Sequence, residues 1–177
     1  KETFQGFETK RFLTGFTPLG FSYYPDTIMN SCEHITIISD EYGISTLILN
    51  KIRNIALENG YDVTAFYSPI DPDTGVEHII IPELNIAYAT SNRYHYFKAQ
   101  RYCRIRIERF IDKQKLKSRK VRVSFIKNAK YEILQEAISS IKLAKEIHDE
   151  LEKYYINAMN YDGVNSLLKE TVKKLFK

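Results

Sequence analysis

Residues 34–67 read HITIISDEYGISTLILNKIRNIALENGYDVTAFY. The run 34–38 is short and β-branched, which predicts a buried strand. From Ser45 the apolar residues recur at helical spacing, and Gly60 stands where a helix would end in a left-handed cap. Residues 61–67 then predict a second strand. This strand–loop–helix–strand order is a βαβ unit, which normally means a parallel sheet with a right-handed crossover.

The segments on either side of this unit predict further strands. Residues 11–17 predict a short strand that ends in a turn at Pro18 and Gly20, because proline fixes its own φ and glycine permits a tight reversal. Beyond the unit a turn-rich loop is predicted at 68–75, and strands are predicted at 77–81, 85–90, 103–111 and 121–126.

The C-terminal part of the chain has a helical pattern. Apolar residues recur near i, i+3, i+4 and i+7 from Ala129 to Asn157, which predicts a long amphipathic helix, and residues 164–176 predict a closing helix. The fold prediction is therefore a three-layer α/β domain with a mainly parallel sheet. It spans 1–177 as a single domain, with an α/β core at 1–126 and a helical C-terminal extension at 127–177.

The composition is that of an ordinary globular protein. The chain has 177 residues, of which 44% are hydrophobic and 27% are charged. No apolar run reaches the roughly 18 residues needed to span a bilayer, and the start lacks a signal-peptide pattern. Cys32 and Cys103 belong to no metal-spaced pair, and we expect them to be reduced, buried thiols. We therefore expect a cytoplasmic protein with no membrane partner.

The net charge of +4 is unevenly distributed along the chain. Residues 93–122 carry 12 Lys or Arg against Glu108 and Asp112, a balance of +10, so the remainder has a balance of −6. A basic segment of this kind suits an anionic partner such as a nucleic acid, or it forms a solvated face.

The loop after the first predicted strand lies where many α/β proteins bind phosphate. Against G-x-x-x-x-G-K-[ST], Gly43 and Ser45 match and Thr46 follows, but Ile38 replaces the first glycine and Ile44 replaces the lysine. Glycines let the backbone wrap the phosphates, the lysine neutralises them, and the Ser or Thr holds Mg²⁺. The loop therefore lacks the lysine whose positive charge would neutralise the phosphates.

Two carboxylates in the same loop oppose an anionic ligand. Asp40 and Glu41 would lie near a bound triphosphate, and one like-charge pair at about 4 Å costs roughly 4 kcal/mol at an effective dielectric near 20. The loop is thus either the remnant of a phosphate loop or an ordinary connection that Ser45 caps.

The wider sequence favours the first interpretation. Three segments resemble a family of largely uncharacterised bacterial P-loop ATPases with two tandem P-loop-like halves: FLTGFTPLGF (12–21), NGYDVTAFYSPIDPDTGVEHIIIPELNIAYATSN (59–92) and AKEIHDELEKYYINAMNYDGV (144–164). The family's loop has the form GxxGxGKST. This chain departs from it at Ile38, Glu41 and Ile44.

The resemblance covers nearly the whole chain and fits the second of the two halves. It implies a P-loop NTPase-like fold with a degenerate phosphate loop, and we expect the chain to be part of a longer protein. If the loop functions, its ligands would be ATP and Mg²⁺. The partners it implies are an intact P-loop ATPase half or a second copy of this chain.

Other residue types suggest candidate sites. Asp71 and Glu83 lie near predicted strand ends and are candidate catalytic acids or bases, with Ser45 and Asp71 as the Mg²⁺ ligands if the ion binds. The alternatives are turn chemistry for Asp71 and a helix-start acid for Glu83. Arg101 and Arg104 are candidate phosphate contacts, or members of one exposed strand face.

The histidines predict less specific roles. His78 precedes an apolar run and is expected to lie in the core, and His95 is expected to pack among aromatic residues. His148 and Glu152 have the i, i+4 spacing of two metal ligands on one helix face, but no third ligand is evident from the sequence.

Three hypotheses for function follow. The first is a P-loop NTPase-like domain that has lost its nucleotide site and has a structural or regulatory role. The second is an active ATPase or kinase-like phosphotransferase with an atypical loop that uses Ser45, Thr46 and Asp71 near Mg²⁺. The third is a nucleic-acid-binding module that uses the basic segment 93–122.

Overall fold

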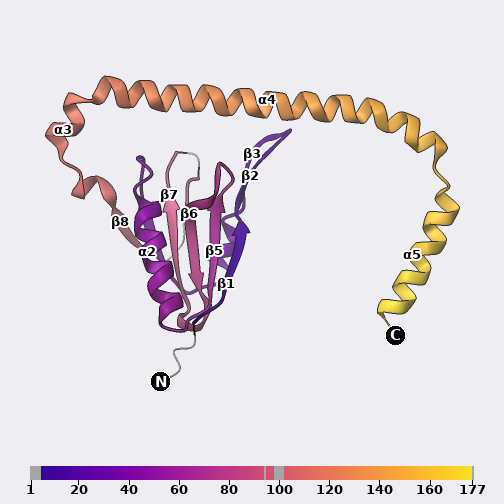
Figure 1. Cartoon of the computed structure of the whole chain (residues 1–177), viewed down its shortest axis with the longest axis horizontal. Coiled ribbons are helices and arrows are strands. Elements are labelled where there is room, and N and C mark those ends of the chain that lie inside the picture. The colour runs from indigo at the N-terminus through magenta and orange to yellow at the C-terminus, as the bar shows by residue number, and fades with distance from the viewer. Residues whose placement is uncertain (1–4, 94, 98–101, 177) are drawn as a thin grey trace.

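The computed structural model describes residues 5–93, 95–97 and 102–176. A six-stranded sheet has the strand order β1-β5-β6-β7-β4-β8 (Figure 1). The strands are β1 (Glu8–Phe12), β4 (His34–Ser39), β5 (Val63–Ser68), β6 (Asp71–Ile81), β7 (Ile86–Ser91) and β8 (Cys103–Arg106). Only β6 runs against the others, since it pairs antiparallel with both β5 and β7 while the remaining pairs are parallel.

The predicted βαβ unit is confirmed. Helix α2 (Ser45–Glu58) connects β4 to β5, and Gly60 follows it with a φ of 85°, in the left-handed region where a Cβ is unfavourable. The hairpin β6–β7 lies between β4 and β5 in the sheet. The α/β class and the mostly parallel sheet are therefore as predicted, with one antiparallel strand inserted.

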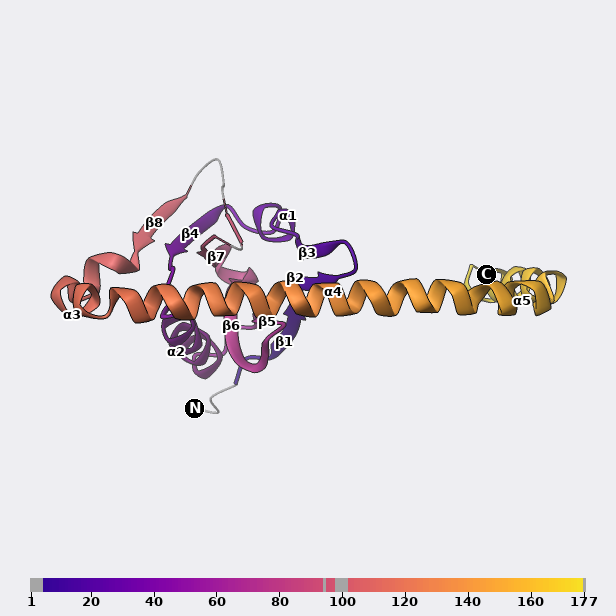
Figure 2. The same ribbon diagram turned by 90° about the horizontal axis from the view of Figure 1, so that it is seen from above.

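The two faces of the sheet bury separate cores because successive side chains of a strand point in opposite directions. Ile38 of β4 packs with Leu49 of α2 on one face. Ile35 and Ile37 belong to the core on the other face, which includes Ile28 of the one-turn helix α1 (Asp26–Met29). That second face is covered by α1 and by the hairpin of β2 (Thr14–Thr17) and β3 (Gly20–Tyr23) (Figure 2).

Several predicted element bounds require correction. The strand predicted at 11–17 is divided, because β1 ends at Phe12 and β2 begins at Thr14, and the turn predicted after it is confirmed by a φ of 116° at Gly20. The strand predicted at 103–111 ends at Arg106 and continues as the 3-10 helix η2 (Ile107–Phe110). The predicted loop at 68–75 already contains the start of β6.

The strand predicted at 121–126 is wrong. These residues belong to α4 (Lys120–Ala158), which follows the short helix α3 (Lys113–Ser118). The segment does not pair with the sheet, so its β-branched residues have no partner strand and the helical pattern that follows it extends over it. The helical part of the chain thus begins at Lys113, before residue 127.

Helix α4 crosses the carboxyl edge of the sheet and continues well beyond it (Figures 1 and 2). Helix α5 (Tyr161–Leu175) then turns away from the axis of α4. No helix among the described residues has the length and apolarity that a membrane crossing requires. Both cysteines are free thiols; Cys32 is buried as expected, whereas Cys103 is exposed.

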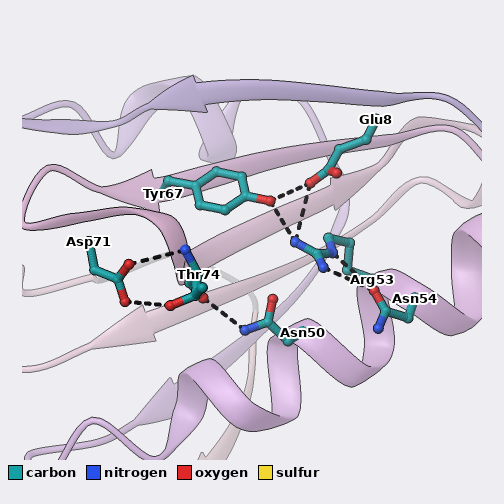
Figure 3. A network of polar contacts seen from close by, with 7 residues as sticks. All are labelled: Glu8, Asn50, Arg53, Asn54, Tyr67, Asp71 and Thr74. Carbon is teal, nitrogen blue, oxygen red and sulfur yellow. Dashed lines mark hydrogen bonds and ion pairs between the residues drawn. The ribbon is translucent and has the colours of Figure 1, made fainter.

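A polar network connects three elements of the core (Figure 3). The hydroxyl of Tyr67 on β5 donates to Oε1 of Glu8 on β1 at 2.6 Å and accepts from Nη1 of Arg53 on α2 at 2.5 Å. Burial, together with the Glu8 carboxylate, raises the pKa of Tyr67 to about 12. The phenol therefore stays protonated and joins the edge strand β1 to the helix.

Candidate functional site

A cavity of about 610 Å³ lies at the carboxyl edge of the sheet, next to the first half of α4. Its size is within the range of about 300–1,000 Å³ that is usual for small-molecule sites. The loop after β4, the β5–β6 turn, the β2–β3 hairpin and α4 all contribute to its wall. The sequence-predicted residues Gly43, Ser45, Thr46 and Asp71 line this one cavity.

The loop after β4 folds around the carboxylate of Asp40, which is only 2% exposed. Its Oδ1 accepts hydrogen bonds from the backbone N–H groups of Tyr42 at 2.8 Å and Gly43 at 3.1 Å. Its Oδ2 accepts from the N–H of Ser45 at 2.5 Å. Backbone N–H groups of such a loop and helix start are the donors that hold phosphate in other proteins. Here the chain's own anion occupies them.

The alternative in which Ser45 caps the helix is wrong. Ile44 is the N-cap residue of α2 and makes no side-chain cap, and Ser45 is the first helical residue. The buried hydroxyl of Ser45 accepts a hydrogen bond from Oγ1 of Thr90 on β7 at 3.1 Å. Asp40 instead supplies the acceptor that a capping side chain usually provides. Gly43 has a φ of 78°, which permits the tight path of the loop.

Glu41, the second loop carboxylate, is paired with cations. Its Oε2 lies 3.8 Å from Nε of Arg93 and 4.0 Å from Nζ of Lys127 on α4. Lys127 also lies 4.5 Å from the ring centre of Tyr42. The two acidic residues thus have different roles. Asp40 stabilises the loop by accepting hydrogen bonds from its backbone N–H groups, and Glu41 contacts α4 through a partly exposed ion pair of modest strength.

Asp71 has a structural role in the β5–β6 turn. Its Oδ2 accepts from Oγ1 of Thr74 at 2.7 Å and its Oδ1 from the Thr74 N–H at 3.1 Å, while Nδ2 of Asn50 donates to the Thr74 carbonyl at 2.9 Å (Figure 3). The hydrogen bonds from Thr74 lower the pKa of Asp71. A carboxylate with a lowered pKa is a weaker general base, although Asp71 still faces the cavity.

Glu83 and the arginine candidates do not join this site. Glu83 is exposed in the 3-10 helix η1 (Pro82–Leu84), just before Ile86, which pairs with the first residue of β4. It therefore lies at the opposite edge of the sheet. Arg104 on β8 lies 5.1 Å from the ring centre of Tyr102 and is not among the residues that line the cavity. Arg101 lies outside the described residues.

Glu77 of β6 and His95 form the polar floor of the cavity. His95 Nε2 lies 3.6 Å from Glu77 Oε1, and Oγ1 of Thr14 donates to Glu77 Oε2 at 3.4 Å. Burial raises the pKa of Glu77, whereas burial and then the nearby charge of Lys130 lower the pKa of His95 to about 4. His95 is therefore neutral at pH 7, and the contact is not a salt bridge there.

His78 lies next to Glu77 and His95, and together the three residues could offer ligands to a metal ion. Ligand atoms of Glu77, His78 and His95 all lie within 4.8 Å of one another. However, His78 Nδ1 accepts a hydrogen bond from the Thr90 N–H at 3.2 Å, so the proton of the neutral imidazole is on Nε2. A metal-bound histidine ordinarily donates its second ring nitrogen. The arrangement of His78 therefore does not fit a three-ligand metal site.

The histidine on α4 has a third potential ligand that the sequence spacing did not indicate. Ligand atoms of His148, Asp149 and Glu152 lie within 4.8 Å of one another. His148 and Glu152 are exposed, and the Asp149 carboxylate already pairs with Lys145. This group has the composition of an ordinary charged helix face.

Comparison of the chain with protein-family models, with curated proteins and with solved structures finds no match.

Sequence reasoning missed several residues of the cavity. Glu77 lies on β6 beside His78, and an adjacent Glu-His pair in a strand matches no known site motif. Lys127 and Lys130 reach the cavity from α4, far along the chain from the loop. Their i, i+3 spacing on one side of the helix was the only available signal.

Proposed function

We propose that this chain is a P-loop NTPase-like domain with a degenerate phosphate loop and a structural or regulatory role. One observation carries the proposal: three backbone N–H groups of the loop, at Tyr42, Gly43 and Ser45, bind the carboxylate of Asp40. A nucleotide would have to displace this buried carboxylate. It would also have to do so beside Ile44, where a phosphate loop has its lysine.

The remaining cavity residues support the same proposal. Arg93 and Lys127 both pair with Glu41, and the Ser45 hydroxyl accepts a hydrogen bond from Thr90. The two candidate Mg²⁺ ligands, Ser45 and Asp71, thus both have partners within the chain. ATP and Mg²⁺ remain the ligands to test because the loop has the position and the length of a phosphate loop.

Calorimetric titration with Mg-ATP tests this proposal. We expect no saturable binding by the natural sequence up to about 1 mM Mg-ATP. A dissociation constant of about 1 mM corresponds to a binding free energy of about −4 kcal/mol, so any binding should be weaker than that. The double variant Asp40→Gly with Ile44→Lys frees the three donors and restores the lysine, and we expect it to gain binding. Binding by the natural sequence at millimolar or lower concentration that Ser45→Ala abolishes would contradict the proposal and favour an ATPase or kinase-like enzyme.

A second candidate function rests on the basic surface of β8, α3 and the start of α4. From 102 to 122 the chain has nine Lys or Arg and two acids, and Tyr102 and Phe110 are 43% and 80% exposed. Cations beside exposed rings suit single-stranded nucleic acid, in which phosphates and bases are contacted together. Fluorescence anisotropy with a labelled oligonucleotide should then show affinity that falls steeply with salt, and salt-insensitive or absent binding would exclude this candidate.

A further inference from the structure

The second half of α4 and the whole of α5 present apolar side chains to solvent. Ten large side chains contribute, each at least 44% exposed: Leu143, Ile147, Leu151, Tyr154, Tyr155, Val164, Leu167, Leu168, Val172 and Leu175. Between 142 and 176 every residue except the half-buried Asp149 is exposed. This is a larger apolar surface than a self-contained helix normally leaves open.

Ile147, Leu151 and Tyr154 lie in one stripe along α4, whereas Leu143, Tyr155 and the exposed Ile156 lie off it. Residues 140, 144, 147, 151, 154 and 158 follow alternating steps of four and three, the spacing of a coiled-coil seam. Lys142, Glu146, Asp149 and Lys153 lie on the other side of the helix. The stretch 139–158 is about 30 Å long at 1.5 Å per residue. Helices obtain most of their stability from packing such a stripe, so this surface requires a partner.

The stripe is complementary to a second, antiparallel copy of itself. If a two-fold axis lies between Ile147 and Leu151, each Ile147 meets Leu151 of the other copy. The same register places the small Ala144 opposite the large Tyr154, and Ser140 opposite Ala158. The Ala144–Tyr154 layer thus pairs a small side chain with a large one, the central Ile147–Leu151 layer pairs two branched aliphatic side chains, and the outer Ser140–Ala158 layer lets the backbones approach closely.

The available area also suits a dimer. At roughly 80–100 Å² for each of the ten side chains, one copy would bury on the order of 800–1,000 Å², which is the usual size of a stable interface on one partner. Because the same surface is used on both copies, the contact closes with two-fold symmetry and leaves no further face open for growth.

We propose that α4 and α5 form a symmetric dimer interface with a second copy of this chain, in which the two α4 helices pack antiparallel with Ile147 against Leu151. This interface does not depend on the state of the phosphate loop. Light scattering coupled to gel filtration should give twice the chain mass of 20.7 kDa at about 100 µM.

Matched variants test which face is used. Ile147→Glu with Leu151→Glu places two charges in the seam and should give a monomer. Ser139→Glu with Asn157→Glu adds the same charge to the polar side of the same helix and should remain a dimer. A monomeric natural chain at about 100 µM, or equal behaviour of the two double variants, would overturn the proposal.

Disulfide cross-linking tests the register without disturbing the fold. In a Cys103→Ser background, which removes the exposed thiol, Ala144→Cys and Tyr154→Cys chains are mixed and oxidised. The mixture should form a cross-linked dimer, whereas neither chain alone should, because like positions are separated by about 15 Å along the helix. A dimer that forms without the mixed cross-link would rule out this register.

Discussion

The carboxylate of Asp40 accepts a hydrogen bond from the backbone N–H of Ser45, five residues further along the chain, at 2.5 Å. Two more N–H groups of the same loop bind the other carboxylate oxygen. The loop therefore binds a carboxylate of its own chain through these three N–H groups.

Removing the Asp40 carboxylate should destabilise the protein. Asp40→Ala removes a buried carboxylate and leaves three loop N–H groups without their charged acceptor, so we expect a loss of about 2–4 kcal/mol in the free energy of unfolding. Urea denaturation followed by circular dichroism measures the change. Glu41→Gln is the control, since its partly exposed ion pairs contribute at most about 1 kcal/mol. Equal losses for the two variants would contradict the assigned roles.

Stability should fall as the pH falls from about 6.5 to about 4. His95 has a folded pKa of about 4, below its ordinary value of 6.5, so in this range the unfolded chain binds a proton that the folded chain does not. The loss attributable to His95 is roughly 3 kcal/mol across the range. Burial also lowers the pKa of His78, which adds to the effect.

Glu77 acts in the opposite direction. Its folded pKa is raised, so its contribution favours the folded state at low pH and is lost as the pH rises through the folded value. The variant His95→Gln isolates the histidine. Urea midpoints measured at several pH values should show a smaller pH dependence for His95→Gln than for the natural chain, and identical slopes would refute the role of His95.

Removing the Tyr67 hydroxyl should weaken the connection between β1, β5 and α2. Tyr67→Phe deletes the hydrogen bonds to Glu8 and Arg53, and we expect a loss of about 1–2 kcal/mol. Tyr24→Phe is the matched control because Tyr24 is 66% exposed. In a spectroscopic titration the natural chain should contain a tyrosine with a pKa of about 12 that Tyr67→Phe lacks.

Two glycine substitutions should have opposite consequences. A Cβ on Gly6 would lie 2.0 Å from the Tyr61 carbonyl oxygen, so Gly6→Ala must displace backbone and should destabilise by more than about 1 kcal/mol. A Cβ on Gly15 in β2 would meet no heavy atom within 4 Å. Gly15→Ala should therefore be neutral or slightly stabilising. Thermal unfolding distinguishes the two, and a tolerated Gly6→Ala would contradict the close approach of the two segments.

The sequence predicted helices and strands correctly where the spacing of apolar residues and the position of a terminating glycine indicated the same element. The run 34–38, the helix from Ser45 and Gly60 gave the βαβ unit because each signal lies within a few residues. The strand expected at 121–126 failed since β-branched residues form a strand only beside a partner strand, and the sheet places none there. The amphipathic pattern from Ala129 to Asn157 predicted most of α4 but not its position.

The description of the candidate site required both the sequence and the tertiary structure. The sequence by itself determined that Ile44 stands where the phosphate-loop motif has a lysine and that the loop contains Asp40. Both facts concern residue type alone and need no coordinates. Only the tertiary structure decided that Asp40 points inward to the loop N–H groups while Glu41 points to Arg93 and Lys127. Contacts between distant segments, such as His95 with Glu77, arise from the folding of the sheet and leave no regular spacing in the chain.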